Sequence, residues 1–152
     1  MPIGIRLIKS KHLAIAFDGE GARQYGGRWN SPGTAVVYTA QSESLAALEL
    51  LVHLQSSQLL MSYSTIPVEF NDRLLEVVGP ATLPRDWRDY PAPSILQEVG
   101  DRWAFEQRSV VLQVPSAIVS DEVNYVLNPR HPGFAKITIG KPKSFKFDPR
   151  LK

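Results

Sequence analysis

Residues 45–54 read LAALELLVHL, a helical segment in which Glu49 and His53 are the two residues that are not apolar. Because Glu49 and His53 are four positions apart, they share one face of the helix and form a narrow polar wedge. Such a helix is expected to be covered by protein on most sides and open along one strip. The strip is either a solvent-facing stripe or a carboxylate held in a cleft, and this segment alone leaves both interpretations open.

The segments around this helix predict a single α+β domain over residues 1–152. TAVVYTA (34–40) is typical of a strand, and Ser42 is a suitable N-cap for the helix, which should weaken at 55–57. A second helix is expected at 94–106, with Gly100 as a weak point. Further strands are predicted at 3–8, 61–70, 74–78, 109–115, 134–140 and 144–147.

Two segments rich in polar residues and glycine are predicted as loops, at 9–33 and 116–134. Pro67 interrupts the strand at 61–70, which indicates an edge strand because proline cannot donate a ladder hydrogen bond. The expected architecture is a mixed sheet of about six to eight short strands with two main helices.

Composition excludes several kinds of function. The net charge of +2 and the absence of a basic run argue against direct nucleic-acid binding. The chain has no cysteine, which excludes disulfides and thiolate chemistry, and its three histidines are scattered, so no metal site is expected. No apolar run has the length of a membrane span or a signal-peptide core, so we expect a cytoplasmic protein that does not enter a membrane.

Two candidate ligand-binding residues lie before the helix. In YGGRWNSPG (25–33) the paired glycines present Arg28 at a turn, where its guanidinium could fork onto a phosphate or form an ordinary surface ion pair. Tyr38 could stack on a planar ligand, or it could be a core tyrosine with a satisfied hydroxyl group.

Four further candidates lie in the second polar segment: Ser116, Asn124, Asn128 and His131. No GxSxG motif surrounds Ser116, so a serine hydrolase is disfavoured. Asn128 precedes a proline and is also explained by turn chemistry, and His131 is also explained as a loop histidine before Pro132.

Three runs together resemble the RES-domain toxins of bacterial toxin–antitoxin pairs: FDGEGARQYGGRWNSPGTAVVYTAQSESLAALELLVHL (17–54), LQVPSAIVSDEVNYVLNPRHPGF (112–134) and FKFDPRL (145–151). The family's arginine, glutamate and serine fall on Arg28, Glu49 and Ser116, and its active-site tyrosine falls on Tyr38. The resemblance implies a fold similar to mono-ADP-ribosyltransferases, with NAD as substrate and no resident cofactor. It also implies a cognate Xre-type helix-turn-helix antitoxin and a homodimer within the toxin–antitoxin complex.

Within this resemblance, Glu49 would stabilise the cationic transition state of nicotinamide–ribose cleavage. Arg28 would hold the dinucleotide phosphates and Tyr38 would pack on the nicotinamide or ribose. Ser116 would donate a positioning hydrogen bond, and Asn128 and His131 would contribute to substrate binding. Inorganic phosphate, water or a protein side chain could be the acceptor, giving an NAD phosphorylase, a glycohydrolase or an ADP-ribosyltransferase. A non-catalytic nucleotide-binding module is the alternative from another class.

Overall fold

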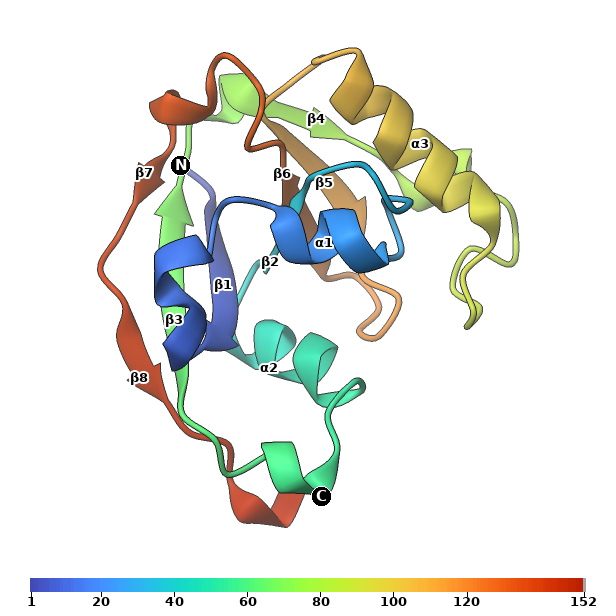
Figure 1. The fold of residues 1–152 in the computed structure, drawn as a ribbon. Helices are drawn as coiled ribbons and strands as arrows, with labels where there is room; N and C mark the ends of the chain where they lie inside the picture. The colour runs from blue at the N-terminus through green and yellow to red at the C-terminus, as the bar shows by residue number, and fades with distance from the viewer. Residues whose placement is uncertain (152) are drawn as a thin grey trace.

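The structure, a computed structural model, describes residues 1–151 and contains one mixed, eight-stranded sheet (Figure 1). The strands are ordered β4-β5-β6-β2-β1-β3-β7, and β8 also pairs with β3. β4 and β5 run parallel, and the other pairs run antiparallel. The predicted α+β class is therefore confirmed. The strands are β1 (Ile3–Lys9), β2 (Val37–Ala40), β3 (Tyr63–Glu69), β4 (Leu75–Val77), β5 (Val111–Pro115), β6 (Val123–Leu127), β7 (Thr138–Ile139) and β8 (Lys143–Phe145).

The helix that contains Glu49 begins as predicted. The Ser42 side chain accepts a hydrogen bond from the Leu45 backbone N–H at 3.1 Å. The helix ends earlier than expected, at Leu51, so His53 lies in the following turn. The α-helices are α1 (Glu20–Tyr25), α2 (Glu43–Leu51) and α3 (Ser94–Phe105). The 3-10 turns are η1 (Ser10–Ile15), η2 (Ser56–Gln58), η3 (Asp72–Leu74), η4 (Pro80–Thr82), η5 (Phe134–Lys136) and η6 (Pro149–Leu151).

The prediction that 9–33 is a loop was wrong, because this segment contains η1 and α1. Two glycines frame α1 with left-handed backbone conformations that other residues rarely adopt: Gly19 at φ 74° and Gly26 at φ 73°. The glycines that indicated a loop are therefore the residues that begin and end a short helix.

The prediction that 116–134 is a loop was also wrong, because β6 lies inside it. β6 pairs with β2 on one side and β5 on the other, so it is an internal strand of the sheet. Its five residues, VNYVL, are flanked by polar residues, and its partner β2 is distant in sequence, whereas β5 is the preceding strand. Long-range pairing of this kind leaves little local signal.

The edge position predicted for the Pro67 strand was wrong as well. β3 pairs with β1 along its whole length, and on its other side it pairs with β8 at residues 63–65 and with β7 at residues 68–69. Pro67 lies between these two pairings, where the ladder is interrupted. The sheet therefore accommodates the missing N–H by dividing the outer partner into two strands.

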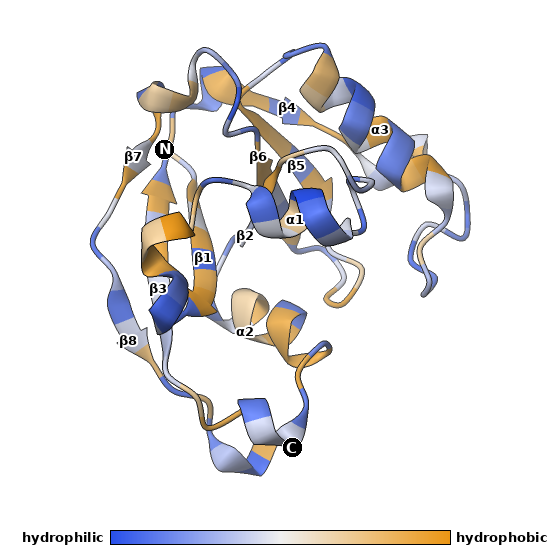
Figure 2. Cartoon of the chain, in the orientation of Figure 1, coloured by the Kyte–Doolittle hydropathy of each residue, from blue (hydrophilic) through white to orange (hydrophobic). Residues whose placement is uncertain are grey.

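Both faces of the sheet centre are buried. In β5, Val111 packs into the hydrophobic cluster on one face, while Leu112 packs into the cluster that α3 covers with Leu96 and Trp103. α2 covers a third cluster over β1. Figure 2 shows the same arrangement, with β5 apolar over most of its length and an α3 that alternates between polar and apolar residues.

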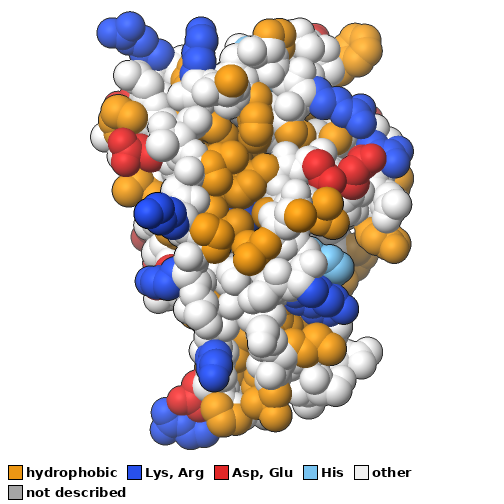
Figure 3. Space-filling model, turned by 60° about the vertical axis from the view of Figure 1, so that its left-hand side comes forward, with side chains coloured by type: hydrophobic (Ala, Val, Ile, Leu, Met, Phe, Trp, Pro, Cys, Tyr) orange, Lys and Arg blue, Asp and Glu red, His pale blue; other side chains and the backbone are white. Residues whose placement is uncertain are grey.

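The surface on the β7–β8 side has apolar side chains gathered in its middle, with Lys and Arg side chains around them (Figure 3). Ile3 on β1 and Ile139 on β7 are among the exposed apolar residues of these strands. None of the helices in residues 1–151 is long and apolar enough to cross a bilayer.

Candidate active site

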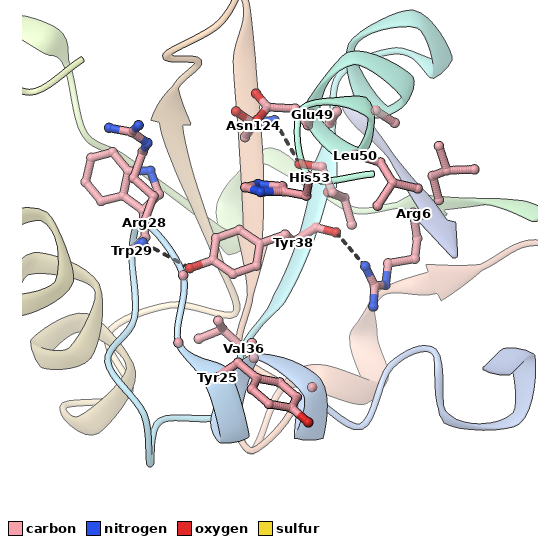
Figure 4. A pocket seen from close by; sticks show the side chains of 18 of the residues that line it. Arg6, Tyr25, Arg28, Trp29, Val36, Tyr38, Glu49, Leu50, His53 and Asn124 are labelled. Carbon is pink, nitrogen blue, oxygen red and sulfur yellow. Dashed lines mark hydrogen bonds between the residues drawn. The ribbon is translucent and has the colours of Figure 1, made fainter. Parts of the chain in front are cut away.

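An open cleft of about 1400 Å³ lies between the β1–β2 region of the sheet, α1 and α2. Side chains from β1, the α1 region, β2, the α2 region and β6 meet there, as Figure 4 shows. The polar residues that line it include Arg6, Arg28, Tyr38, Glu49, His53 and Asn124. The sequence prediction that Glu49 faces a cleft, rather than an open solvent stripe, therefore agrees with its position.

Glu49 is half-buried in the wall formed by α2. Its carboxylate accepts a hydrogen bond from the Ser116 hydroxyl group, with Oγ and Oε1 3.0 Å apart. Burial raises the pKa of Glu49 above its ordinary value, while hydrogen bonds from Ser116 and Asn124 and the charge of Arg28 oppose that rise. Glu49 is thus a partly desolvated carboxylate in a fixed orientation.

Ser116 is buried behind Glu49 and does not line the cleft. Its Oγ accepts hydrogen bonds from the backbone N–H groups of Ile118 and Val119, both at 3.1 Å. These two donors leave the hydroxyl proton directed at Glu49. Ser116 therefore holds the carboxylate in place and does not reach a ligand in the cleft.

Arg28 enters the cleft from the loop after α1. Gly27 allows this approach, because a Cβ there would lie 2.7 Å from the Tyr38 hydroxyl oxygen. The guanidinium donates from Nη1 to the Trp87 carbonyl oxygen at 2.8 Å and from Nη2 to the Asp89 carbonyl oxygen at 3.2 Å. Burial lowers the pKa of Arg28, and the charge of Glu49 is the largest opposing influence. Arg28 forms no salt bridge within residues 1–151.

The Tyr38 hydroxyl group is fully engaged. It accepts from the Trp29 backbone N–H at 3.0 Å and donates to Asn30 Oδ1 at 2.6 Å. Burial raises the pKa of the hydroxyl above its ordinary value, so the phenol stays protonated. The ring lines the cleft, and Tyr38 can therefore contact a ligand through its ring while its hydroxyl group fixes the Arg28 loop.

The helix α3 supports the Arg28 loop from behind. Gln97 Nε2 donates to the carbonyl oxygens of Gly27 at 3.0 Å and Asn30 at 3.1 Å. The Asp101 carboxylate accepts from the backbone N–H and the hydroxyl group of Ser31. At Gly100 an added Cβ would lie 1.7 Å from the Trp29 carbonyl oxygen, so the loop contacts the helix backbone itself.

Asn128 and His131, expected as substrate-binding residues, do not line the cleft. The Asn128 amide donates to the Ala104 carbonyl oxygen at 3.2 Å. His131 Nδ1 accepts from the Gly133 N–H at 2.8 Å, and Nε2 lies 3.0 Å from the Gln107 carbonyl oxygen. Both side chains connect loops to the end of α3. They therefore have a structural role, which was the alternative interpretation given for each of them in the sequence analysis.

Sequence reasoning did not assign Arg6 to the site, and it named Asn124 as a candidate without giving it a role. Arg6 comes from β1 and Asn124 from β6, the strand that was predicted as loop. The alternating pattern of IGIRLI places Arg6 on one face of its strand, but sequence alone does not show that this face borders a cleft. His53 also lines the cleft, just beyond α2. Residues 1–151 contain no group of three or more His, Asp or Glu side chains that could hold a metal ion.

Comparison with known proteins identifies the family of this chain. A model of the RES domain matches residues 5–148. The chain belongs to the RES-domain family. Toxin Res of Yersinia enterocolitica is 42% identical over 148 residues, covering 97% of each chain. The Prs ADP-ribosylating toxin of a Sphingobium species is 41% identical over 136 residues, covering 88% of this chain and 84% of the relative.

A solved structure also shares the fold. A chain in the crystal structure of the M. tuberculosis MbcT-MbcA toxin-antitoxin complex superimposes with a TM-score of 0.80 at 22% identity. The match covers 99% of this RES-domain chain and 86% of the other. The identification as a relative of RES-domain toxins, expected from the sequence, is confirmed.

Proposed function

We propose that this RES-domain protein is a toxin that cleaves the nicotinamide–ribose bond of NAD, which it takes as substrate without a resident cofactor. The observation that carries the proposal is the Glu49 carboxylate, half-buried in the cleft wall and fixed by Ser116 at 3.0 Å. The chain's relatives support the assignment, because they are named toxins and one is named an ADP-ribosylating toxin.

Cleavage of this bond needs a negative charge more than it needs an acid. The electron pair of the breaking bond leaves with nicotinamide, which departs as a neutral molecule and requires no proton. The ribose is left with oxocarbenium character, and an adjacent carboxylate stabilises that positive charge. Partial burial of Glu49 strengthens the interaction, because fewer water molecules screen it.

Arg28 would fix the dinucleotide against Glu49 through its phosphates. A guanidinium carries five N–H donors, and Arg28 directs two of them at the carbonyl oxygens of Trp87 and Asp89. Within residues 1–151 no hydrogen bond engages the remaining donors, which can therefore fork onto a phosphate group. The Tyr38 ring would pack on the nicotinamide or ribose, and Ser116 would act on the substrate only through Glu49.

The group that accepts the ADP-ribose defines the reaction class. Our first candidate is depletion of NAD by phosphorolysis or hydrolysis. Transfer of ADP-ribose to a host protein is the second candidate, which the name of the Sphingobium relative favours. A purely nucleotide-binding role would require the cleft to bind NAD without releasing nicotinamide.

The products formed from NAD by the purified protein distinguish these functions. We expect nicotinamide release. Release that requires added phosphate and yields ADP-ribose 1″-phosphate identifies phosphorolysis, and release without phosphate that yields free ADP-ribose identifies hydrolysis. Radiolabelled protein bands in a cell extract would identify transfer. No nicotinamide under any of these conditions would refute NAD cleavage.

An antitoxin would control this activity by covering the cleft. Its rim carries exposed apolar side chains, including Tyr25 at 82% and Tyr90 at 84% exposure, together with Ile15 and Val52. Rims of this kind are typical of protein-binding surfaces. We therefore propose a cytoplasmic toxin, homodimeric in its complex and inhibited by an Xre-type antitoxin that blocks NAD access, with any contact to DNA made by the antitoxin.

Hydrogen exchange with and without the antitoxin tests this occlusion. Protection is expected at 21–33 and 86–92, the segments that carry Arg28, Tyr25 and Tyr90. β6 is a poor reporter, because an internal strand is already protected in the free protein. Loss of activity with protection confined to the β7–β8 side would contradict occlusion.

A further inference from the structure

The segment 83–93, which joins η4 to α3, is bonded to two separate parts of the proposed site. The Arg28 guanidinium donates to two of its backbone carbonyl oxygens, as described above. A second arginine, Arg88, extends from the segment to the turn 116–122 between β5 and β6. The segment is therefore connected both to the Arg28 loop and to the turn that begins with Ser116.

Arg88 uses its whole guanidinium in this contact. Nε and Nη2 donate to the Ala117 carbonyl oxygen at 3.4 and 3.2 Å, and Nη1 donates to Ser120 Oγ at 3.1 Å. The guanidinium carbon also lies 5.9 Å from the centroid of the Trp87 ring, within the range of a cation–π contact. Arg88 forms no salt bridge within residues 1–151. An ammonium group could not reproduce this forked geometry.

The same turn directs the Ser116 hydroxyl group. Ser116 Oγ accepts from the backbone N–H groups of Ile118 and Val119 and donates to the Glu49 carboxylate. A hydroxyl group has one proton, and the two backbone donors leave that proton for Glu49. A displacement of the turn would therefore weaken the hydrogen bond that fixes the carboxylate.

A cavity separates part of the turn from the segment that Arg88 belongs to. The cavity has a volume of about 390 Å³, and Trp87, Ser116 and Ser120 are among the residues that line it. Asp121, also in the turn, has a φ of 69°, a left-handed conformation that persists only where the surrounding structure holds it. Because the cavity takes the place of side-chain packing here, the hydrogen bonds of Arg88 hold the turn against the segment.

We propose that Arg88 is a positioning residue that holds the turn after β5 and, through Ser116, orients the Glu49 carboxylate. The inference deepens the proposed function, on which its kinetic test rests. Arg88 also lines the cleft, but each of its guanidinium nitrogens already donates to the turn. The segment 83–93 thereby couples the two charged groups of the site, Arg28 through its backbone and Glu49 through Arg88.

The test is the pKa of Glu49, measured by NMR titration of its carboxyl carbon, which needs no turnover. Arg28 and His53 are the groups whose charges act on this pKa in the wild type. Arg88→Gln removes the fork and the charge, whereas Arg88→Lys keeps the charge alone. Arg85→Gln, at an exposed arginine of the same segment that lines neither cavity, is the matched control.

We expect Arg88→Gln to raise the pKa of Glu49, because a displaced Ser116 donates a weaker hydrogen bond to the ionised carboxylate. Arg88→Lys should raise it less, and Arg85→Gln should match wild type. In a Ser116→Ala background Arg88→Gln should cause no further rise, because the hydrogen bond through which Arg88 acts is already absent. For nicotinamide release, Arg88→Gln should lower kcat by about tenfold and leave KM for NAD unchanged.

Three results would overturn the inference. A wild-type pKa of Glu49 in Arg88→Gln would show that Arg88 does not act on the carboxylate. The same rise with and without Ser116 would show that its charge acts without the turn. A raised KM for NAD at a wild-type pKa would make Arg88 a substrate-binding residue instead.

Melting temperatures establish that each variant folds, and Arg88→Lys carries the test if Arg88→Gln does not. Nicotinamide release by the wild type is measured separately. If the wild type releases no nicotinamide, the NAD-cleaving function fails, whereas the pKa of Glu49 in the variants still decides the role of Arg88.

Discussion

The contact between α3 and the Arg28 loop gives a quantitative test of how the site is positioned. Replacing Gly100 with alanine adds a Cβ that would lie 1.7 Å from the Trp29 carbonyl oxygen and 2.8 Å from the Trp29 carbonyl carbon. Real Cβ contacts are essentially never shorter than 3.0 Å, so helix and loop must separate by at least 1.3 Å (3.0 − 1.7) along this contact. Trp29 is adjacent to Arg28, so the displacement passes directly to the guanidinium.

The effect on activity should be larger than the effect on stability. Misplacing a substrate-positioning group by about 1 Å can reduce turnover by about 100-fold. Overpacking costs about 1–3 kcal/mol, and the better helix propensity of alanine offsets about 1 kcal/mol of it. We therefore expect Gly100→Ala to fold, with a free energy of unfolding lowered by at most about 2 kcal/mol.

The assay is nicotinamide release from NAD, with kcat/KM compared at equal folded fraction. Gly79→Ala is the matched control, because a Cβ at Gly79 meets no atom within 4 Å. If Gly100→Ala is folded, as its melting temperature will show, and its kcat/KM equals that of the wild type, the claim that α3 sets the position of Arg28 is refuted.

Three further predictions concern single side chains. Ser116→Ala removes a hydrogen bond that favours the ionised carboxylate, so the pKa of Glu49 should rise further and the acidic limb of the kcat/KM profile should move to higher pH. An acidic limb at the wild-type pH would show that Ser116 does not act on the ionisation of Glu49. Lysine in Arg28→Lys cannot donate to both the Trp87 and Asp89 carbonyl oxygens in the same geometry, so we expect weaker NAD binding and faster hydrogen exchange at 87–89. An unchanged affinity for NAD would show that Arg28 does not bind the dinucleotide. Because the folded-state pKa of Glu49 is raised, the wild type loses stability as pH rises above the ordinary glutamate range. Glu49→Gln should therefore melt no lower than wild type at neutral pH, and any advantage of the variant should disappear in acid. A lower melting temperature of Glu49→Gln at neutral pH would contradict the raised pKa.

The sequence predicts best the features that depend on local spacing. The N-cap at Ser42, the strand before it and the isolated carboxylate at Glu49 all follow from neighbouring residues, and the structure contains each of them. The motif resemblance likewise indicates the family. It does not indicate that Ser116 acts from behind Glu49, because that geometry depends on two backbone N–H donors in the turn after β5.

Features that depend on distant parts of the chain were missed. β6 was predicted as loop because its five residues lie among polar residues and its partner β2 is far away in sequence. Gly100 was interpreted as a weakness of α3, although it allows Trp29 to approach the helix. Asn128 and His131 are the reverse case: residue types typical of binding sites whose hydrogen bonds connect loops.

Nicotinamide release by Glu49→Gln measures the central claim most directly. Glu98→Gln, at an exposed glutamate of α3 outside the cleft, removes the same charge and serves as control. If the Glu49 charge stabilises the transition state, Glu49→Gln should lower kcat by about 100-fold or more, with Glu98→Gln at the wild-type value. A Glu49→Gln protein that releases nicotinamide within about twofold of the wild-type rate would contradict the claim.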